Sequence, residues 1–121
     1  MPQFPLYSSR GEWKGMLVDN LIYSPQGEWI GWMDRDRKIF SVVGDYVGWL
    51  NKDFRVLRKR VVEQSGPRRS PPARPPERMR MPVNVPLAPL MAELTFDTID
   101  VFEDMPELLN PFDLDQLPDI D

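Results

Sequence analysis

The 121-residue chain contains no cysteine and no histidine. Their absence excludes disulfides, thiolate nucleophiles, zinc sites of the Cys/His type and catalytic triads with an imidazole base. No apolar run approaches the roughly 18 residues that span a bilayer, and the start of the chain lacks the basic and apolar regions of a signal peptide. We therefore expect a soluble, cytoplasmic protein with no membrane span, whose chemistry is mostly binding.

Lysine and arginine are absent after Arg80, although the whole chain carries a net charge of only -4. Residues 1–60 have 10 Lys and Arg against 7 Asp and Glu, and residues 61–82 have 5 against 2. Residues 83–121 have 10 Asp and Glu and no basic residue. A basic part followed by an acidic part indicates segments that meet different partners, or that meet each other.

Aromatic and proline residues divide the chain in the same way. All 4 Trp and all 3 Tyr precede Arg60, whereas the 14 Pro are concentrated after it. Proline lacks an N–H donor, so the Pro-rich stretch can be neither a helix interior nor a central strand. We predict a folded domain over residues 4–62, an extended Pro/Arg-rich linker over 63–89 and a mostly disordered, acidic amphiphilic tail over 90–121.

The folded part contains an internal repeat. Three segments of 11 residues match one template, LYSSRGEWKGM from Leu6, IYSPQGEWIGW from Ile22 and IFSVVGDYVGW from Ile39. They share an apolar residue, an aromatic residue, Ser, Gly, an acid, an aromatic residue and a second Gly at fixed positions, with a period of 16 and then 17 residues. A partial fourth copy begins at Arg55 and supplies only a first strand.

Each copy predicts a β-hairpin, because a Ser/Gly turn is flanked by short aromatic and β-branched runs. The expected fold is all-β, an antiparallel meander of about seven short strands. Strict alternation places Trp29 and Trp32 on opposite faces, so that a second aromatic face needs a partner and the chain forms a homo-oligomer. Recurrent glycines are expected beneath aromatic rings or at sharp bends. The residues expected to carry core and self-association are Trp13, Trp29, Trp32, Tyr46, Trp49, Gly15, Gly31 and Gly48; a ligand groove lined with Trp is the alternative.

These motifs, over about residues 6–58, resemble the bacterial 4-fold β-flower domain. The resemblance implies a flower-like, all-β arrangement of hairpins and supplies no catalytic residues. The first copy departs from the pattern at Lys14 and Met16, where the second has Ile30 and Trp32. The first copy is therefore a candidate edge or cap unit.

No catalytic residue, cofactor site or metal site is predicted. Glu12, Glu28 and Asp45 recur after the turn glycines because the repeat recurs, and no spacing places two of them in a cleft. Asp34 and Asp36 lack the remaining ligands of a calcium loop. We expect a protein that is not an enzyme.

A basic arm is the basis of one binding hypothesis. Basic side chains beside a Trp-rich core are typical of nucleic-acid contact, but the acidic tail would compete for the same cations. The candidate contacts are Arg58, Lys59, Arg60, Arg68 and Arg69.

The acidic tail is the basis of a second and favoured hypothesis. Large apolar residues among its acids indicate a peptide that folds on a partner protein or on its own β-core, in pieces separated by Pro106, Pro111 and Pro118. The expected docking residues are Phe102, Leu108, Leu109, Phe112 and Leu114. We therefore expect a non-enzymatic adaptor or assembly protein, with a nucleic-acid-binding protein regulated by its tail as the alternative.

Overall fold

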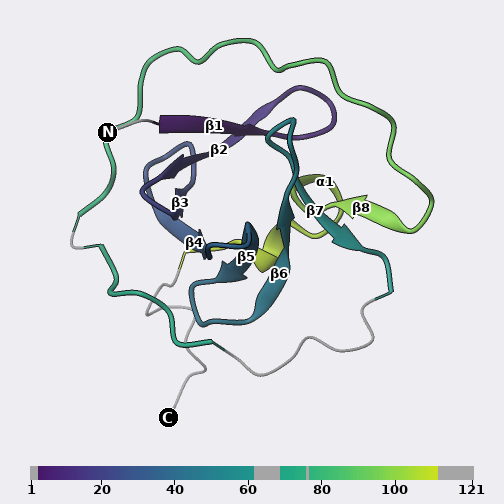
Figure 1. Cartoon of the computed structure of the whole chain (residues 1–121). Helices are drawn as coiled ribbons and strands as arrows, with labels where there is room; N and C mark the ends of the chain where they lie inside the picture. The colour runs from purple at the N-terminus through teal and green to yellow at the C-terminus, as the bar shows by residue number, and fades with distance from the viewer. Residues whose placement is uncertain (1–2, 62–68, 76, 112–121) are drawn as a thin grey trace.

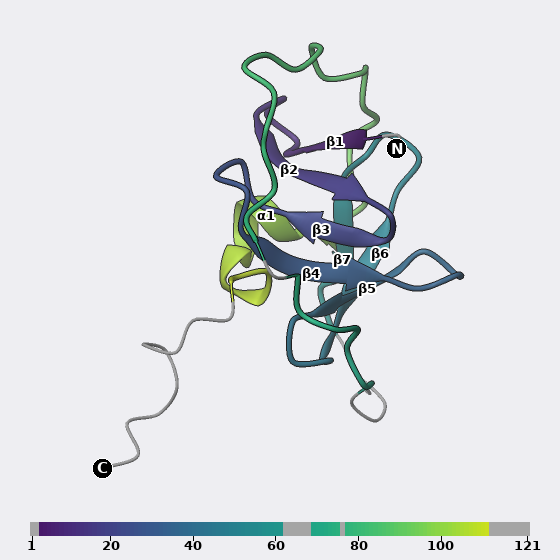
Figure 2. The ribbon, with the colours of Figure 1, turned by 90° about the vertical axis from the view of Figure 1, so that its left-hand side faces the viewer.

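Eight strands form one antiparallel sheet in which every strand pairs with its neighbour in sequence. The computed structural model describes residues 3–61, 69–75 and 77–111. The sheet curls around the core, as Figure 1 and Figure 2 show. This confirms the predicted all-β meander of repeated hairpins. Its strands are β1 (Gln3–Tyr7), β2 (Trp13–Val18), β3 (Leu21–Tyr23), β4 (Trp29–Met33), β5 (Lys38–Ser41), β6 (Tyr46–Leu50), β7 (Val56–Lys59) and β8 (Thr98–Asp100).

The three repeats form the hairpins β1–β2, β3–β4 and β5–β6, each closed by the same turn. In the first turn the Ser8 N–H donates to the Glu12 carbonyl and the Gly11 N–H donates to the Ser8 carbonyl, both at 2.9 Å. The Ser8 hydroxyl also accepts from the backbone N–H of Glu12. The turn glycine has φ +83°, a conformation that glycine adopts without strain. The same Ser, Gly and acid positions make the equivalent backbone bonds in the turns at 24–28 and 41–45.

Each repeated hairpin contains a β-bulge directly after its turn. In β3–β4 the register runs from Ile22 opposite Gly31 to Tyr23 opposite Trp29, so Ile30 is an extra residue. A bulge shifts the alternation of side chains by one residue. The prediction that Trp29 and Trp32 lie on opposite faces is therefore wrong, because both pack in the same cluster.

Two clusters of buried side chains lie on opposite sides of the sheet. The inner core is mainly aliphatic, and the aromatic face holds the Trp residues of β4. The inner core consists of Leu6, Leu17, Ile22, Ile30, Ile39, Val47, Leu50, Val56, Val101, Phe102 and Leu109. The aromatic face consists of Met16, Val18, Tyr23, Trp29, Trp32 and Phe40.

Residues from the acidic part of the chain complete a fourth hairpin. β8 pairs with β7, with Leu57 opposite Asp100 and Lys59 opposite Thr98. A short helix α1 (Val101–Asp104) and a 3-10 turn η1 (Pro106–Leu108) follow. Val56 takes the fully buried position that Leu6, Ile22 and Ile39 hold in the first three hairpins. The sequence predicted the first strand of this fourth copy; β8, its second strand, comes from the region assigned to the tail.

The segment between β7 and β8 surrounds the sheet. Its described residues, 69–75 and 77–95, contain no strand or helix and are called the belt below. Figure 1 shows the belt running round the outside of the strands. Its Arg69 N–H donates to the Gly44 carbonyl at 2.9 Å, and its Met79 N–H donates to the Gly27 carbonyl at 2.8 Å. The belt therefore contacts the repeated turns themselves, in the reverse of their order in the sequence.

The belt also covers the aromatic face. Its Met79, Met81 and Val85 are half-buried against that cluster. The Tyr7 hydroxyl donates to the Pro86 carbonyl, and the side chain of Ala88 lies near Gly11 in the first turn. Within the described ranges, no helix is long and apolar enough to cross a membrane.

Candidate functional site

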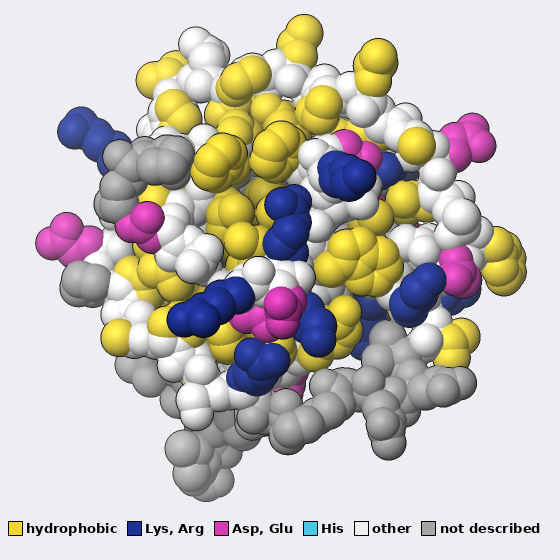
Figure 3. Space-filling view, in the orientation of Figure 1, with side chains coloured by type: hydrophobic (Ala, Val, Ile, Leu, Met, Phe, Trp, Pro, Cys, Tyr) yellow, Lys and Arg dark blue, Asp and Glu magenta, His cyan; other side chains and the backbone are white. Residues whose placement is uncertain are grey.

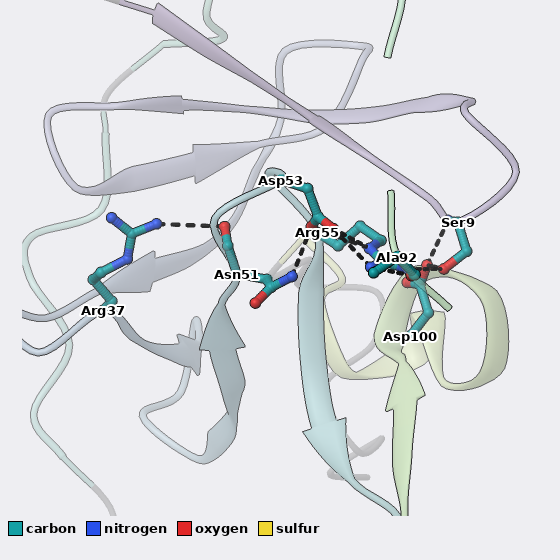
Figure 4. A network of polar contacts seen from close by, with 7 residues as sticks. All are labelled: Ser9, Arg37, Asn51, Asp53, Arg55, Ala92 and Asp100. Carbon is teal, nitrogen blue, oxygen red and sulfur yellow. Dashed lines mark hydrogen bonds and ion pairs between the residues drawn. The ribbon is translucent and has the colours of Figure 1, made fainter. Parts of the chain in front are cut away.

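A buried polar network joins the first hairpin to the last (Figure 4). Asp100, at the end of β8, accepts from the Ser9 backbone N–H at 2.6 Å and from the Ser9 hydroxyl at 2.7 Å. The Arg55 guanidinium donates to the same hydroxyl at 2.9 Å and to the Ala92 carbonyl of the belt at 2.9 Å. The network thus connects the first turn, the residue before β7, the belt and β8.

The charges of this network are paired inside the fold. Arg55 is only 2 % exposed and makes an ion pair with Asp53 at 2.7 Å, and Asn51 donates to the same carboxylate. Burial acts to raise the pKa of Asp53, but the hydrogen bonds from Arg55 and Asn51 outweigh it and hold the pKa below 3.8. Burial dominates at Asp100 and raises the pKa of its carboxyl, although Ser9 and Phe102 donate to it. With both ends satisfied, the network acts as a structural closure.

The repeated acids do not gather in a cleft. Glu12 pairs with Lys14 at 3.6 Å, and Glu28 pairs with Arg78 of the belt at 3.4 Å. The Asp34 carboxylate accepts from two N–H groups of its own turn and pairs with Arg69. Across the part of the chain that the structure describes, no three acidic residues are grouped so as to hold a metal ion.

The predicted self-association residues lie in or beside the aromatic face. Trp29 and Trp32 are each 9 % exposed, Trp13 and Tyr46 pack against the same cluster, and half-buried Trp49 lies opposite Lys38 and Leu57. The indole N–H of Trp13 donates to the Gly15 carbonyl at 2.7 Å, whereas that of Trp29, at the same repeat position, has no partner among the described residues.

A shallow cavity of about 400 Å³ lies beside Trp29. Its walls come from β4, the turn after β5 and the belt. This is the geometric candidate for the Trp-lined ligand groove that the sequence left open. The lining residues are Trp29, Val42, Val43, Pro71, Pro72 and Arg74.

The second glycine of each repeat leaves room for a neighbour. A side chain at Gly48 would meet the Leu57 carbonyl, and one at Gly31 would meet both the Phe40 carbonyl and a Leu109 methyl group at 2.7 Å. At Gly15 the nearest groups are the Tyr23 carbonyl at 3.0 Å and the Phe102 ring at 3.6 Å. Backbone carbonyls thus account for the glycines more than aromatic rings do.

The described members of the predicted basic arm all bond within the chain. Arg58 donates to the Tyr46 and Val47 carbonyls, and Lys59 pairs with Asp97 at 2.9 Å. Arg60 donates to the Phe96 carbonyl and lies over its ring. Arg69 pairs with Asp34 at 3.3 Å and lies over the Phe40 ring. Arg68 lies outside the described residues.

The tail residues divide into two groups. Phe102 and Leu109 are buried in the inner core, and Leu108 packs against it. Figure 2 shows α1 and the turn after it against the sheet. Phe112 and Leu114 lie outside the described residues. The tail up to Leu109 therefore contributes to the chain's own β-core.

Sequence reasoning missed Ser9, Asp53, Asp100 and the apolar side of the belt. Asp100 had one local signal, since an Asp before a short apolar run is a common helix N-cap, and its carboxylate does accept from the Phe102 N–H at 3.0 Å. The pairing of Ser9 with Asp100 spans 91 residues and leaves no local trace.

Comparisons with known proteins agree with the repeat. No curated protein and no solved structure matches the chain. A family model described as "4-fold beta flower protein" matches residues 4–96, which is more than half of the sequence. That description names a fold and no reaction, and the match covers the three repeated hairpins, β7 and the belt. With its three repeated hairpins and the fourth completed by β8, the chain belongs to the 4-fold β-flower family.

Proposed function

We propose that the protein is a non-enzymatic adaptor, in which the closed β-flower positions a C-terminal acidic-apolar segment, residues 112–121, for docking on a partner protein. One observation carries the proposal: Leu109 is 4 % exposed in the inner core, so the tail is anchored two residues before Pro111. The sequence beyond that anchor alternates large apolar residues with four Asp and contains no Lys or Arg. Such a composition is typical of segments that fold on a partner.

The alternative, a nucleic-acid-binding protein, has less support. A basic arm contacts phosphates only with cations that it can bring to them. Arg58, Lys59, Arg60 and Arg69 instead bond to carbonyls, carboxylates or rings of the same chain. Binding would have to break these contacts first.

Self-association through the Trp-rich core has lost its premise. The hypothesis required an uncovered second aromatic face, and Met79, Met81 and Val85 of the belt pack on that face. We therefore assign no interface between copies to Trp29 or Trp32. Whether the chain forms an oligomer through another surface is a separate question.

The adaptor proposal is tested by partner capture with the tagged full chain and with a chain ending at Pro111. We expect the full chain to retain a stoichiometric partner, and both the shortened chain and the Phe112→Ala/Leu114→Ala variant to lose it. Gln116→Ala, in the same segment, is the matched control and should retain it. Equal capture by the full and shortened chains would refute the proposal.

A labelled single-stranded oligonucleotide separates the alternative. The nucleic-acid hypothesis expects salt-sensitive binding that strengthens when residues 112–121 are removed. Our proposal expects no such binding by either chain, measured by fluorescence anisotropy at low salt.

A further inference from the structure

The largest exposed apolar side chains of the belt lie in its uncharged stretch. Residues 81–92, called the arch below, contain no charged residue. Val83 is 96 % exposed, Leu87 is 95 % exposed and Leu90 is 101 % exposed. Figure 3 shows hydrophobic side chains along the top of the molecule, where the arch runs in Figure 1. Contiguous apolar surface of this kind is uncommon on a monomer and marks an interaction site.

The arch is held on the fold by its other side chains. Met81 and Val85 pack on the aromatic face, the Pro86 carbonyl accepts from the Tyr7 hydroxyl, and Ala88 lies near Gly11. From Val85 onward, every third residue is half-buried and the two between are exposed. The apolar side chains are thus presented by a segment whose conformation is already fixed, which lowers the entropy cost of binding.

The arch is symmetric about the bond between Pro86 and Leu87. Half-buried Val85 and Ala88 flank that midpoint, and fully exposed Val83 and Leu90 are equally distant from it. The charged residues that bound the arch, Arg80 and Glu93, are also equally distant from the midpoint and have opposite signs. Both are exposed, and neither makes an ion pair or side-chain hydrogen bond with another described residue.

A two-fold interface places the same surface on both subunits, so it must be complementary to itself. An arch laid antiparallel beside a second arch meets this condition: Val83 of one copy lies opposite Leu90 of the other, and Arg80 lies opposite Glu93. No like charges meet along the uncharged stretch between them. We propose that two copies of this chain associate through their arches in this antiparallel register. This inference does not depend on the docking of residues 112–121.

The mass of the full chain in solution, by light scattering from about 1 to about 100 µM, tests the inference. We expect twice the monomer mass of 14.2 kDa at the upper concentrations. Leu87→Glu/Leu90→Glu should give a monomer with an unchanged near-UV circular dichroism spectrum. Val61→Glu, a matched change at a side chain that is 74 % exposed outside the arch, should leave the dimer intact. A wild-type monomer throughout, or a dimer unaffected by the Leu87/Leu90 change, overturns the inference.

Charge exchange tests the register. Arg80→Glu and Glu93→Arg should each weaken the dimer about fivefold to tenfold, because each change affects two symmetric exposed pairs. The double variant Arg80→Glu/Glu93→Arg should restore the wild-type dissociation constant. Failure of the double variant to recover overturns the antiparallel register. A chain ending at Pro111 should dimerise like the full chain, which distinguishes this interface from the adaptor proposal.

Discussion

The Asp100 carboxylate accepts from both the backbone N–H and the hydroxyl of Ser9, across 91 residues of sequence. Ser9 belongs to the turn of the first hairpin and Asp100 ends the last strand. The two ends of the meander are therefore joined by side chains, although β1 and β8 do not pair. The Tyr7 N–H, which donates to the Phe54 carbonyl at 3.0 Å, adds a backbone contact to the same closure.

Loss of the Ser9 hydroxyl should weaken this closure. Ser9→Ala keeps the backbone bond to Asp100 but leaves buried Arg55 and Asp100 each with one unmade hydrogen bond, which costs about 1–3 kcal/mol. Urea unfolding followed by Trp fluorescence measures the change. Exposed Ser70 supplies the control, since Ser70→Ala should leave the free energy of unfolding unchanged. Equal stability of the two variants would contradict a structural role for the network.

The carboxyl groups should titrate in a definite order. The pKa of Asp97 is lowered to about 2 by hydrogen bonds from Thr95 and Lys59, the pKa of Asp53 lies below 3.8, and the pKa of Asp100 lies above 3.8. Carbon-detected NMR of the side-chain carboxyls measures each midpoint. Thr95→Val should raise the pKa of Asp97 and leave that of Asp53 unchanged.

These directions give opposite effects on stability. The contribution of Asp53 is present above pH 3.8, where the carboxyl is ionised in both states, and is lost as the pH falls through its lower folded pKa. The contribution of Asp100 is present below pH 3.8 and is lost as the pH rises through its higher folded pKa. A midpoint for Asp100 at or below 3.8 would contradict the burial described here.

Two turn glycines form a matched pair for the belt contact. Gly27 has φ +86° and a Cβ there would clash with the Met79 carbonyl, whereas Gly11 has φ +83° and a Cβ there would lie 3.7 Å from the Ala88 side chain. Both alanine variants carry the backbone strain of positive φ, about 1 kcal/mol. Only Gly27→Ala should also displace the belt, seen as faster tryptic cleavage at Arg78 and Arg80. Identical cleavage of the two variants would refute the contact.

Leu108 and Leu109 separate the buried from the half-buried part of the tail. Leu109→Ala should cost about 2–4 kcal/mol, because its side chain fills the inner core beside Gly31. Leu108→Ala, at a half-buried neighbour, should cost less than half as much. Thermal unfolding of both variants measures the difference. Equal losses would mean that Leu109 does not occupy the core.

The repeat could be predicted because its contacts are local. Ser8 and Gly11 meet Glu12 within one turn, and the same residue types recur in the next two copies. The bulge could not be predicted from alternation, because an extra residue such as Ile30 breaks the period that the prediction uses. That single residue changed the expected position of Trp29 and, with it, the argument for self-association through the core.

The closure of the fold was hidden for a different reason. β7 and β8 pair across the whole belt, and short polar strands such as Thr98–Asp100 carry little propensity signal of their own. Proline and arginine in the linker correctly excluded helices and strands there. They gave no sign that Met79, Met81 and Val85 would cover the aromatic face. The candidate tail residues Phe102 and Leu109 were identified by composition, but their place in the chain's own core depends on tertiary contacts.

The central claim is that the acidic part of the chain completes the β-flower. Amide hydrogen exchange of the full chain tests it directly at residues 98–102, which include β8 and the Phe102 N–H bonded to Asp100. The account predicts that these amides are protected to a degree similar to those in the first three hairpins, because β8 pairs with β7 in the same sheet. Exchange at the rate of an unfolded peptide, with β1 to β6 protected, would contradict it.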